Sequence, residues 1–159
     1  MRRALLLVLV AAVGCGGVNK ADLVGKWEGK ISLSDLALDQ AVATAKVSSG
    51  GMDISKEQII QIIETSGSSL TLNEDDTYTM AFGPSSYSGK WDLRGSTISL
   101  TVEKVNGVDP IEIAKTMKVD TTIAQKTKAP WILTLANDAK KLTGSEPNDD
   151  GTTVEFTRK

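Results

Sequence analysis

Short runs in which apolar and polar residues alternate, separated by turn-forming residues, constrain the fold of this chain most strongly. In residues 23–32, Trp27 and Ile31 share one face of an extended chain. Lys26 and Glu28 share the opposite face, and such a period of two is typical of a half-buried β-strand. The pattern recurs and predicts eight strands, at residues 23–32, 69–73, 77–82, 87–93, 97–104, 131–136, 140–144 and 152–158.

The links between these strands differ in length in a regular way. Tight turns follow the second, fourth and sixth strands, at residues 74–76, 94–96 and 137–139. Longer links follow the odd-numbered strands, at residues 33–66, 83–86, 105–129 and 145–151. In an up-and-down meander, links after odd strands all lie at one end of the sheet. We therefore predict an all-β fold, an antiparallel up-and-down barrel of about eight strands, because closure removes exposed strand edges. Its mouth is the end that carries the longer links.

Residues 33–66 interrupt the strand pattern and predict a helix–loop–helix insertion after the first strand. Ser55 and Gln58 are spaced as a capping box at the start of the second helix. The apolar face of this helix must pack on another surface, and it consists of Ile59, Ile60, Ile62 and Ile63. We expect this helix to cover the barrel mouth, beside the second insertion.

Residues 105–129 form a smaller insertion after the fifth strand. Asp109 and Pro110 are typical of a helix start, with Asp as the N-cap and Pro at the first position. Ile111 and Ile113 also fit a strand period. We predict one short helix in this segment.

The N-terminus has the features of a secretory signal peptide. Arg2 and Arg3 precede an apolar run at residues 4–13, which is too short to span a bilayer because a spanning helix needs about 20 residues. Small residues follow, and the single cysteine of the chain, Cys15, lies directly after the run.

Residues Ala12-Val13-Gly14-Cys15 resemble the lipobox of bacterial lipoproteins. The resemblance implies that residues 1–14 are a lipoprotein signal peptide and that Cys15 carries acyl chains. It further implies attachment to the inner or outer membrane of the bacterial cell envelope, outside the cytoplasm. Residues 15–21 then form a lipidated tether, and residues 22–159 form the folded domain. An ordinary secretory signal with an incidental cysteine is the alternative.

The mature chain is acidic. Removal of residues 1–14 leaves 145 of the 159 residues, with 16 basic and 20 acidic side chains and a formal charge of −4. An acidic surface argues against a nucleic acid partner, since phosphate backbones are bound by basic patches.

Short motifs within residues 22–158 are similar to those of the lipocalin-like domains found in many small bacterial lipoproteins. Gly25-Lys26-Trp27 resembles the Gly-x-Trp of lipocalins, whose Trp lies at the closed barrel base against an Arg near the end of the last strand. The resemblance implies that Trp27 and Arg158 form this structural pair, and that a small apolar ligand occupies the barrel. The other motifs are Leu70-Thr71-Leu72, Gly89-Lys90-Trp91, Ile98-Ser99-Leu100, Leu133-Thr134-Leu135 and Leu142-Thr143-Gly144.

The chain offers little for catalysis. It has no histidine, which excludes Ser-His-Asp triads, Cys-His pairs and histidine metal sites. Glu103 and Glu112 are predicted to be exposed rather than paired for acid–base chemistry. Residues 74–76 and 148–151 offer carboxylates to Ca²⁺, but they lack EF-hand spacing and fit hairpin turns better. We predict no catalytic residue, metal site or cofactor.

Three functional classes follow. In the first, the barrel binds a small apolar ligand; Trp27 and Trp91 could line such a cavity, but packing in the core explains them better. In the second, the barrel is filled and its helical end binds an envelope protein, which would leave part of the isoleucine face of residues 59–63 exposed. The third, a carboxylate-dependent hydrolase, requires two acids buried in one cleft.

Overall fold

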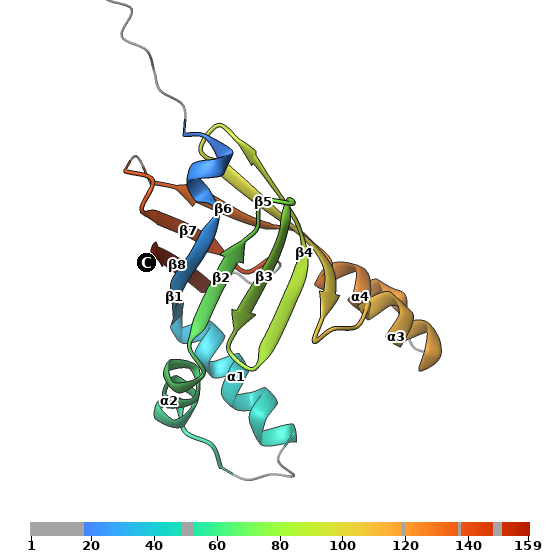
Figure 1. The fold of residues 1–159 in the computed structure, drawn as a ribbon. Coiled ribbons are helices and arrows are strands. Elements are labelled where there is room, and N and C mark those ends of the chain that lie inside the picture. The colour runs from blue at the N-terminus through green and yellow to red at the C-terminus, as the bar shows by residue number, and fades with distance from the viewer. Residues whose placement is uncertain (1–17, 49–52, 119, 137, 148–150) are drawn as a thin grey trace, which may run out of the picture.

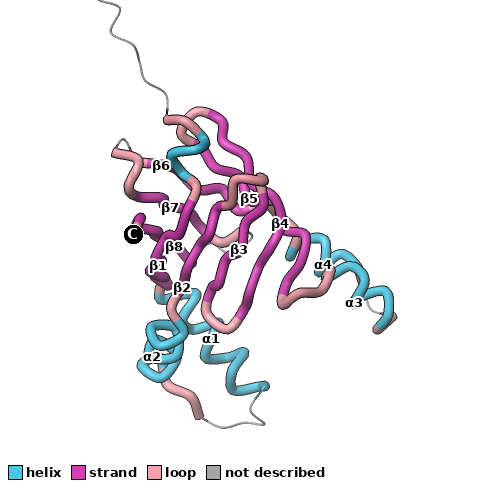
Figure 2. The backbone as a smooth tube through the Cα atoms, in the orientation of Figure 1, coloured by secondary structure: helices cyan, strands magenta, loops and turns pink. Residues whose placement is uncertain are grey.

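The computed structural model describes residues 18–48, 53–118, 120–136, 138–147 and 151–159. Eight strands form one closed antiparallel barrel, in which each strand pairs with the next and the last pairs with the first (Figures 1 and 2). The strands are β1 (Gly25–Leu33), β2 (Ser68–Leu72), β3 (Thr77–Phe82), β4 (Ser85–Arg94), β5 (Thr97–Val105), β6 (Trp131–Leu135), β7 (Lys141–Ser145) and β8 (Thr152–Arg158). The predicted all-β barrel is confirmed, and β3 and β8 have their predicted bounds.

Alternate residues of the strands point inward and fill the barrel. The burial pattern of β6, buried at Trp131, Leu133 and Leu135 and exposed between them, is the clearest case. Each large apolar side chain removed from water stabilises the fold by about 1.5–3 kcal/mol. The largest fully buried side chains are Trp27, Trp131, Tyr78, Phe156, Leu23, Leu70, Leu72, Met80, Ile98, Leu100, Leu133 and Leu142.

The chain enters the barrel through a short 3-10 helix, η1 (Lys20–Leu23), which precedes β1. The prediction that the first strand begins at Leu23 is therefore wrong by two residues. Leu23 turns inward instead, is fully buried, and accepts a hydrogen bond on its carbonyl oxygen from Trp27 Nε1 at 3.1 Å. Val18, within the predicted tether, also packs against the core.

The first insertion holds two helices, α1 (Asp35–Ser48) and α2 (Lys56–Ser66), as predicted. The capping box at the start of α2 is present: Gln58 N donates to Ser55 Oγ at 3.3 Å, and Ser55 N donates to Gln58 Oε1 at 2.8 Å. Satisfying these free N–H groups fixes the first turn of α2.

The second insertion also holds two helices, α3 (Pro110–Thr116) and α4 (Thr121–Thr127). The helix start at Asp109 and Pro110 is confirmed, because Asp109 Oδ1 accepts a hydrogen bond from Ile111 N at 2.9 Å. The predicted short helix is therefore present as α3, and the sequence pattern did not predict the second helix, α4. Asp120 caps the second helix in the same way, accepting from Thr122 N at 2.8 Å.

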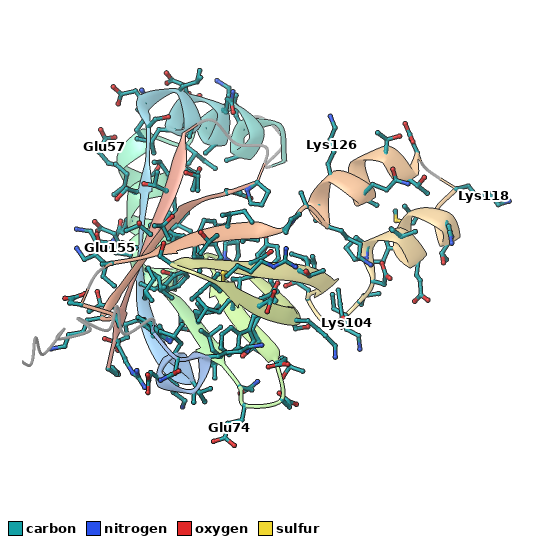
Figure 3. All side chains as sticks on the ribbon, turned by 90° about the horizontal axis from the view of Figure 1, so that it is seen from above. Glu57, Glu74, Lys104, Lys118, Lys126 and Glu155 are labelled. Carbon is teal, nitrogen blue, oxygen red and sulfur yellow. The ribbon has the colours of Figure 1, made fainter. Side chains whose placement is uncertain are left out.

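The two insertions do not lie together. Seen from above, α3 and α4 extend to one side, well away from α2 with its Glu57; Lys126 lies on α4, and Lys118 lies in the link between the two helices (Figure 3). The register explains this position, since β5 continues to Val105 while its pairing with β6 ends at Leu100 and Trp131. The helix pair thus starts from the free end of a long hairpin. The expectation that the isoleucine helix covers the mouth beside residues 105–129 is wrong.

One link at the mouth is tighter than predicted. Phe82 and Ser85 are paired residues of β3 and β4, so the predicted loose link at residues 83–86 is a two-residue turn. Gly83 has φ 55°, a conformation that a residue without a Cβ adopts at little cost. Pro84 completes the turn and brings the two strands close together at the rim.

Candidate functional site

A cavity of about 610 Å³ lies at the barrel mouth, between α1 and the ends of the strands. Figure 1 shows α1 and α2 together at this end, opposite the end where η1 enters. The volume lies within the range of about 300–1,000 Å³ that is typical of small-molecule sites. The residues that line the cavity are Ile31, Leu33, Ala37, Gln40, Ala41, Ala45, Ile63, Phe82, Gly83, Pro84, Glu146 and Thr152.

Helix α1 supplies one wall through three alanines at four-residue spacing: Ala37, Ala41 and Ala45. Residues four apart lie on the same face of a helix, so the three methyl groups form one apolar stripe. At a rise of 1.5 Å per residue, the stripe is about 12 Å long. Because alanine side chains are small, this wall leaves room between the helix and the strands.

The start of α1 is fixed to the barrel. Ser34 N donates to the carbonyl oxygen of Gly151 at 2.7 Å, and Ser34 Oγ accepts from Ala37 N at 3.2 Å. A Cβ atom at Gly151 would collide with the Ser34 side chain. The absence of a side chain at residue 151 therefore permits the close approach of α1 to β8, and the cavity wall is held in place by backbone contacts.

The opposite wall comes from the strand ends and is apolar except at two positions. Ile31, Leu33 and Phe82 are half-buried there. Thr152 is buried, and its carbonyl oxygen accepts from Glu146 N at 3.1 Å, which continues the β7–β8 ladder by one residue. Glu146 is therefore paired with a residue whose side chain faces inward.

Glu146 is an acidic residue on the interior face of the barrel. It continues the alternation of Leu142 and Gly144, and its side chain is half-buried. Burial, and to a lesser extent the negative charge of Glu146, raise the pKa of Tyr87 above its ordinary value of 10.0. The Tyr87 phenol thus stays neutral at physiological pH beside this carboxylate.

On the inner side of the cavity, large buried side chains fill the barrel. The ring of Trp131 packs edge-on against Phe82, with 4.8 Å between ring centroids, and against Tyr87 at 5.9 Å. Trp131 is only 1% exposed. These three rings close the mouth end of the core, and the cavity described above lies on their outer side, next to α1.

Tyr78 stands in this filled interior. It is 1% exposed, and its hydroxyl group has no hydrogen-bond partner among the described residues. An unsatisfied buried hydroxyl costs about 1–3 kcal/mol. Burial is also the main reason why the pKa of Tyr78 lies well above its ordinary value of 10.0.

The structure brings the predicted pair Trp27 and Arg158 together at the closed base. The guanidinium carbon of Arg158 lies 5.8 Å from the centroid of the Trp27 ring. The same guanidinium donates to the carbonyl oxygens of Asp22 and, at 3.1 Å, of Val24. This contact joins the last strand to the segment that enters the first strand.

Trp91 occupies a second position at the base. It is buried, and its Nε1 donates to the carbonyl oxygen of Asn73 at 3.0 Å. Lys20 Nζ lies 4.5 Å from the centroid of the Trp91 ring and forms an ion pair with Asp76 at 2.6 Å. Trp27 and Trp91 are therefore core residues of the base and do not line the cavity at the mouth.

The remaining candidates lie apart from the cavity. Glu103 on β5 and Glu112 on α3 are exposed, and the 74–76 segment forms a hairpin turn in which Asp75 accepts from Thr77 N at 3.1 Å. Within the described part of the chain, no group of three or more Cys, Asp or Glu side chains is placed to hold a metal ion. Cys15, residues 1–14 and residues 148–150 lie outside the described residues.

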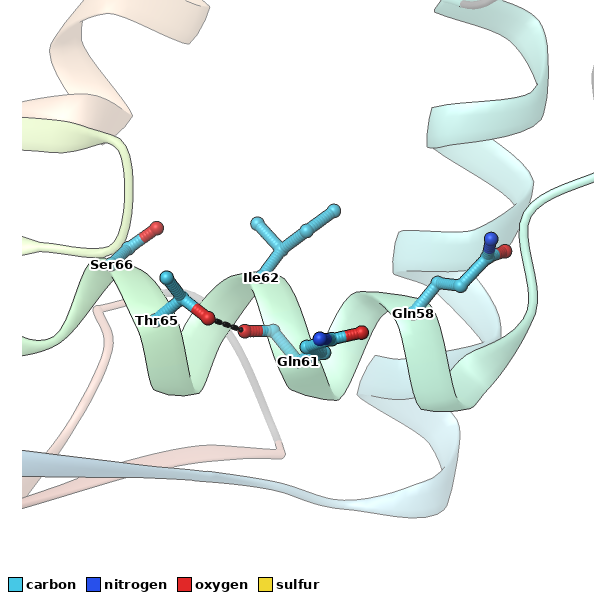
Figure 4. A pocket seen from close by; sticks show the side chains of 5 residues that line it. All are labelled: Gln58, Gln61, Ile62, Thr65 and Ser66. Atoms are coloured by element: carbon cyan, nitrogen blue, oxygen red, sulfur yellow. Dashed lines mark hydrogen bonds between the residues drawn. The ribbon is translucent and has the colours of Figure 1, made fainter.

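The outer face of α2 is a different kind of surface. Figure 4 shows Ile62 standing on this face among Gln58, Gln61, Thr65 and Ser66, and it is 52% exposed. Ile59 is buried, Ile63 lines the cavity, and Ile60 is 39% exposed. The isoleucine face is thus divided between the barrel and solvent.

In the described part of the chain, no helix has both the length and the apolar character needed to cross a membrane.

Comparisons with known proteins include a distant structural likeness. No protein-family model matches the chain, and no curated protein sequence shows a significant match. Among solved structures, the chain is similar to a DUF4847 family protein from Bacteroides vulgatus ATCC 8482, at 15% identity and a TM-score of 0.40, over 86% of this chain and 94% of that one. The class of the present chain, a closed eight-stranded antiparallel barrel, rests on its own strand pairing.

Proposed function

We propose that this chain is a lipid-anchored protein of the bacterial cell envelope whose lipocalin-like barrel binds a small apolar ligand without catalysing a reaction. The observation that carries the proposal is the cavity at the mouth, which is walled by the alanine stripe of α1 and by Ile31, Leu33 and Phe82. A concave, mostly apolar surface with few polar groups is typical of ligand-binding sites.

The anchor follows from the lipobox-like residues 12–15. Acyl chains on Cys15 would be its attachment to the membrane, since two anchoring signals suffice for stable attachment. The test is labelling of the full chain with radioactive palmitate in a bacterium that processes lipoproteins. We expect label in the wild type and none in Cys15→Ser; equal labelling of both would refute the anchor.

The ligand is tested with residues 16–159, secreted without the anchor and purified without detergent. We expect the native mass to exceed the denatured mass by a reproducible amount. Ala41→Phe, which fills the cavity, should lose this extra mass, whereas Ala43→Phe on the exposed face of α1 should retain it. An extra mass that both variants retain would place the ligand elsewhere.

The second candidate function is binding to an envelope protein through the helical end. The exposed apolar side chains of Ile60 and Ile62 on α2 favour it. Crosslinking in intact cells from a photoreactive residue at position 62 distinguishes the two functions. A discrete adduct there, together with a bare native mass, would favour protein binding.

A further inference from the structure

We infer that the ligand at the mouth is a cationic amphiphile, with its apolar chain along α1 and its ammonium group at Glu146. This inference rests on the proposed ligand-binding function and adds the chemical class of the ligand. It concerns the space between α1 and the rim, because the barrel below is closed by Trp131, Phe82 and Tyr87.

The first argument is the composition of the lining. Of the described residues that line the cavity, Glu146 is the only ionisable one. Gln40 and Thr152 are polar and neutral, and the rest are apolar or backbone. A ligand with an anionic head would therefore meet a like charge, and no described residue of the lining carries a positive charge, whereas an ammonium group would meet a carboxylate.

The second argument is that Glu146 is held in place. Its backbone N–H bonds to Thr152 across the β7–β8 ladder, and its side chain follows the inward-facing positions of Leu142 and Gly144. The carboxylate is also only half-exposed, so its field is less screened than that of a surface acid. A partly buried acid whose backbone is fixed at the inner face of a barrel is suited to orienting a ligand.

The third argument is the shape of the apolar part. The stripe of Ala37, Ala41 and Ala45 runs about 12 Å along α1, with Ile63 beside it. A long narrow strip of small side chains accommodates an extended alkyl chain better than a broad ring system. An alkyl chain with one cationic head satisfies both the strip and the carboxylate.

The test uses three probes with the same ten-carbon chain: decylammonium, decanoate and decyl maltoside, each below its critical micelle concentration. Binding to residues 16–159 is measured by titration calorimetry at neutral pH. We expect decylammonium to bind about tenfold more tightly than decanoate, since a charge-assisted hydrogen bond distinguishes them.

Three variants separate the effect of the charge from that of the cavity. Glu146→Gln should reduce the preference for decylammonium to less than about threefold, whereas Glu64→Gln, which removes an equal charge from the exposed surface of α2, should leave it unchanged. Ala41→Phe should weaken all three probes. Circular dichroism on each variant checks that the fold is kept.

The outcomes are distinguishable. Probe binding that Ala41→Phe weakens, but that favours decanoate or ignores Glu146→Gln, would overturn the cationic class and leave the ligand-binding function standing. Failure of all three probes to bind the wild type would overturn this inference, and a bare native mass in the co-purification experiment would overturn the proposed function itself.

Discussion

The two ends of the barrel are built from the same eight strands but are finished in opposite ways. At the base, Leu23 and Trp27 fill the interior, and Arg158 and Lys20 fasten the entering segment to the barrel through Trp27 and Trp91. At the mouth, α1 meets the strands through alanines and leaves a cavity. The comparison predicts that the base contributes more to stability than the mouth, which would leave the mouth free to be shaped for binding.

The largest effect expected from this comparison is at Trp27. Trp27→Ala should lower the free energy of unfolding by about 3–5 kcal/mol, because it removes a buried ring and leaves a cavity at the base. Urea denaturation measures it. Ile62→Ala, at an exposed position on α2, serves as the matched control and should change stability by less than about 0.5 kcal/mol. Equal losses in the two variants would contradict a stabilising base.

A smaller effect is expected at Arg158. Arg158→Ala removes the contact with the Trp27 ring and the hydrogen bonds to the carbonyl oxygens of Asp22 and Val24, so stability should fall by about 1 kcal/mol. Hydrogen exchange should also show faster opening of the amides of η1. Arg158→Lys keeps the cation but not the planar fork, and should restore only part of the loss. Full restoration by lysine would show that charge alone matters.

Tyr78 tests whether the filled interior is optimal. Tyr78→Phe removes a buried hydroxyl that has no partner among the described residues, so stability at pH 7 should stay equal or rise by up to about 1 kcal/mol. A clear loss in thermal denaturation would instead mean that this hydroxyl is satisfied in solution.

The same variant has a pH dependence with a defined sign. Burial raises the pKa of Tyr78 in the folded state, so only the unfolded chain releases this proton near the ordinary value of 10.0. The contribution of the neutral Tyr78 to the stability of the wild type is therefore fully present below pH 10 and is lost as the pH rises beyond it. Tyr78→Phe should lose less stability between pH 9 and 11, as measured by denaturation at each pH.

The smallest expected effect on stability is at the mouth. Ala41→Phe should change the free energy of unfolding by less than about 1 kcal/mol, because the cavity receives the added ring, whereas overpacking a filled core costs about 1–3 kcal/mol. Met80→Trp, in the filled interior, is the matched control. If Ala41→Phe proved as destabilising as Met80→Trp, the mouth would be packed as tightly as the core.

Sequence reasoning succeeded where a local pattern determines local structure. The alternation in residues 152–158 predicted β8 with its observed bounds, and the Ser55–Gln58 spacing predicted the capping box of α2. It failed where position depends on register. The sideways course of α3 and α4 depends on the pairing of β5 and β6 ending at Leu100, a long-range fact that periodicity does not contain.

Sequence patterns were equally limited in predicting the cavity. The alternation of Leu142 and Gly144, continued by two residues, would place Glu146 on the inner face, but the sequence pattern predicts a strand that ends at residue 144. The three alanines of α1 lie in a segment whose helical pattern is weak in the sequence. Their role as a cavity wall is visible only from their position beside the strand ends in the structure. The contact between Trp27 and Arg158 was expected from a resemblance to a Gly-x-Trp motif, and the structure places the two side chains together.

The contacts between the N-terminal segment and the barrel constrain the orientation of the protein at the membrane. Val18 and Lys20 already contact the barrel, so with Cys15 acylated as proposed, only three residue steps separate the anchor from the base. Three extended residues reach at most about 11 Å. The base would then face the bilayer at close range, and the opening under α1 would point toward the aqueous compartment. In this orientation the ligand would reach the cavity from the aqueous compartment or from a carrier protein, and not directly from the bilayer.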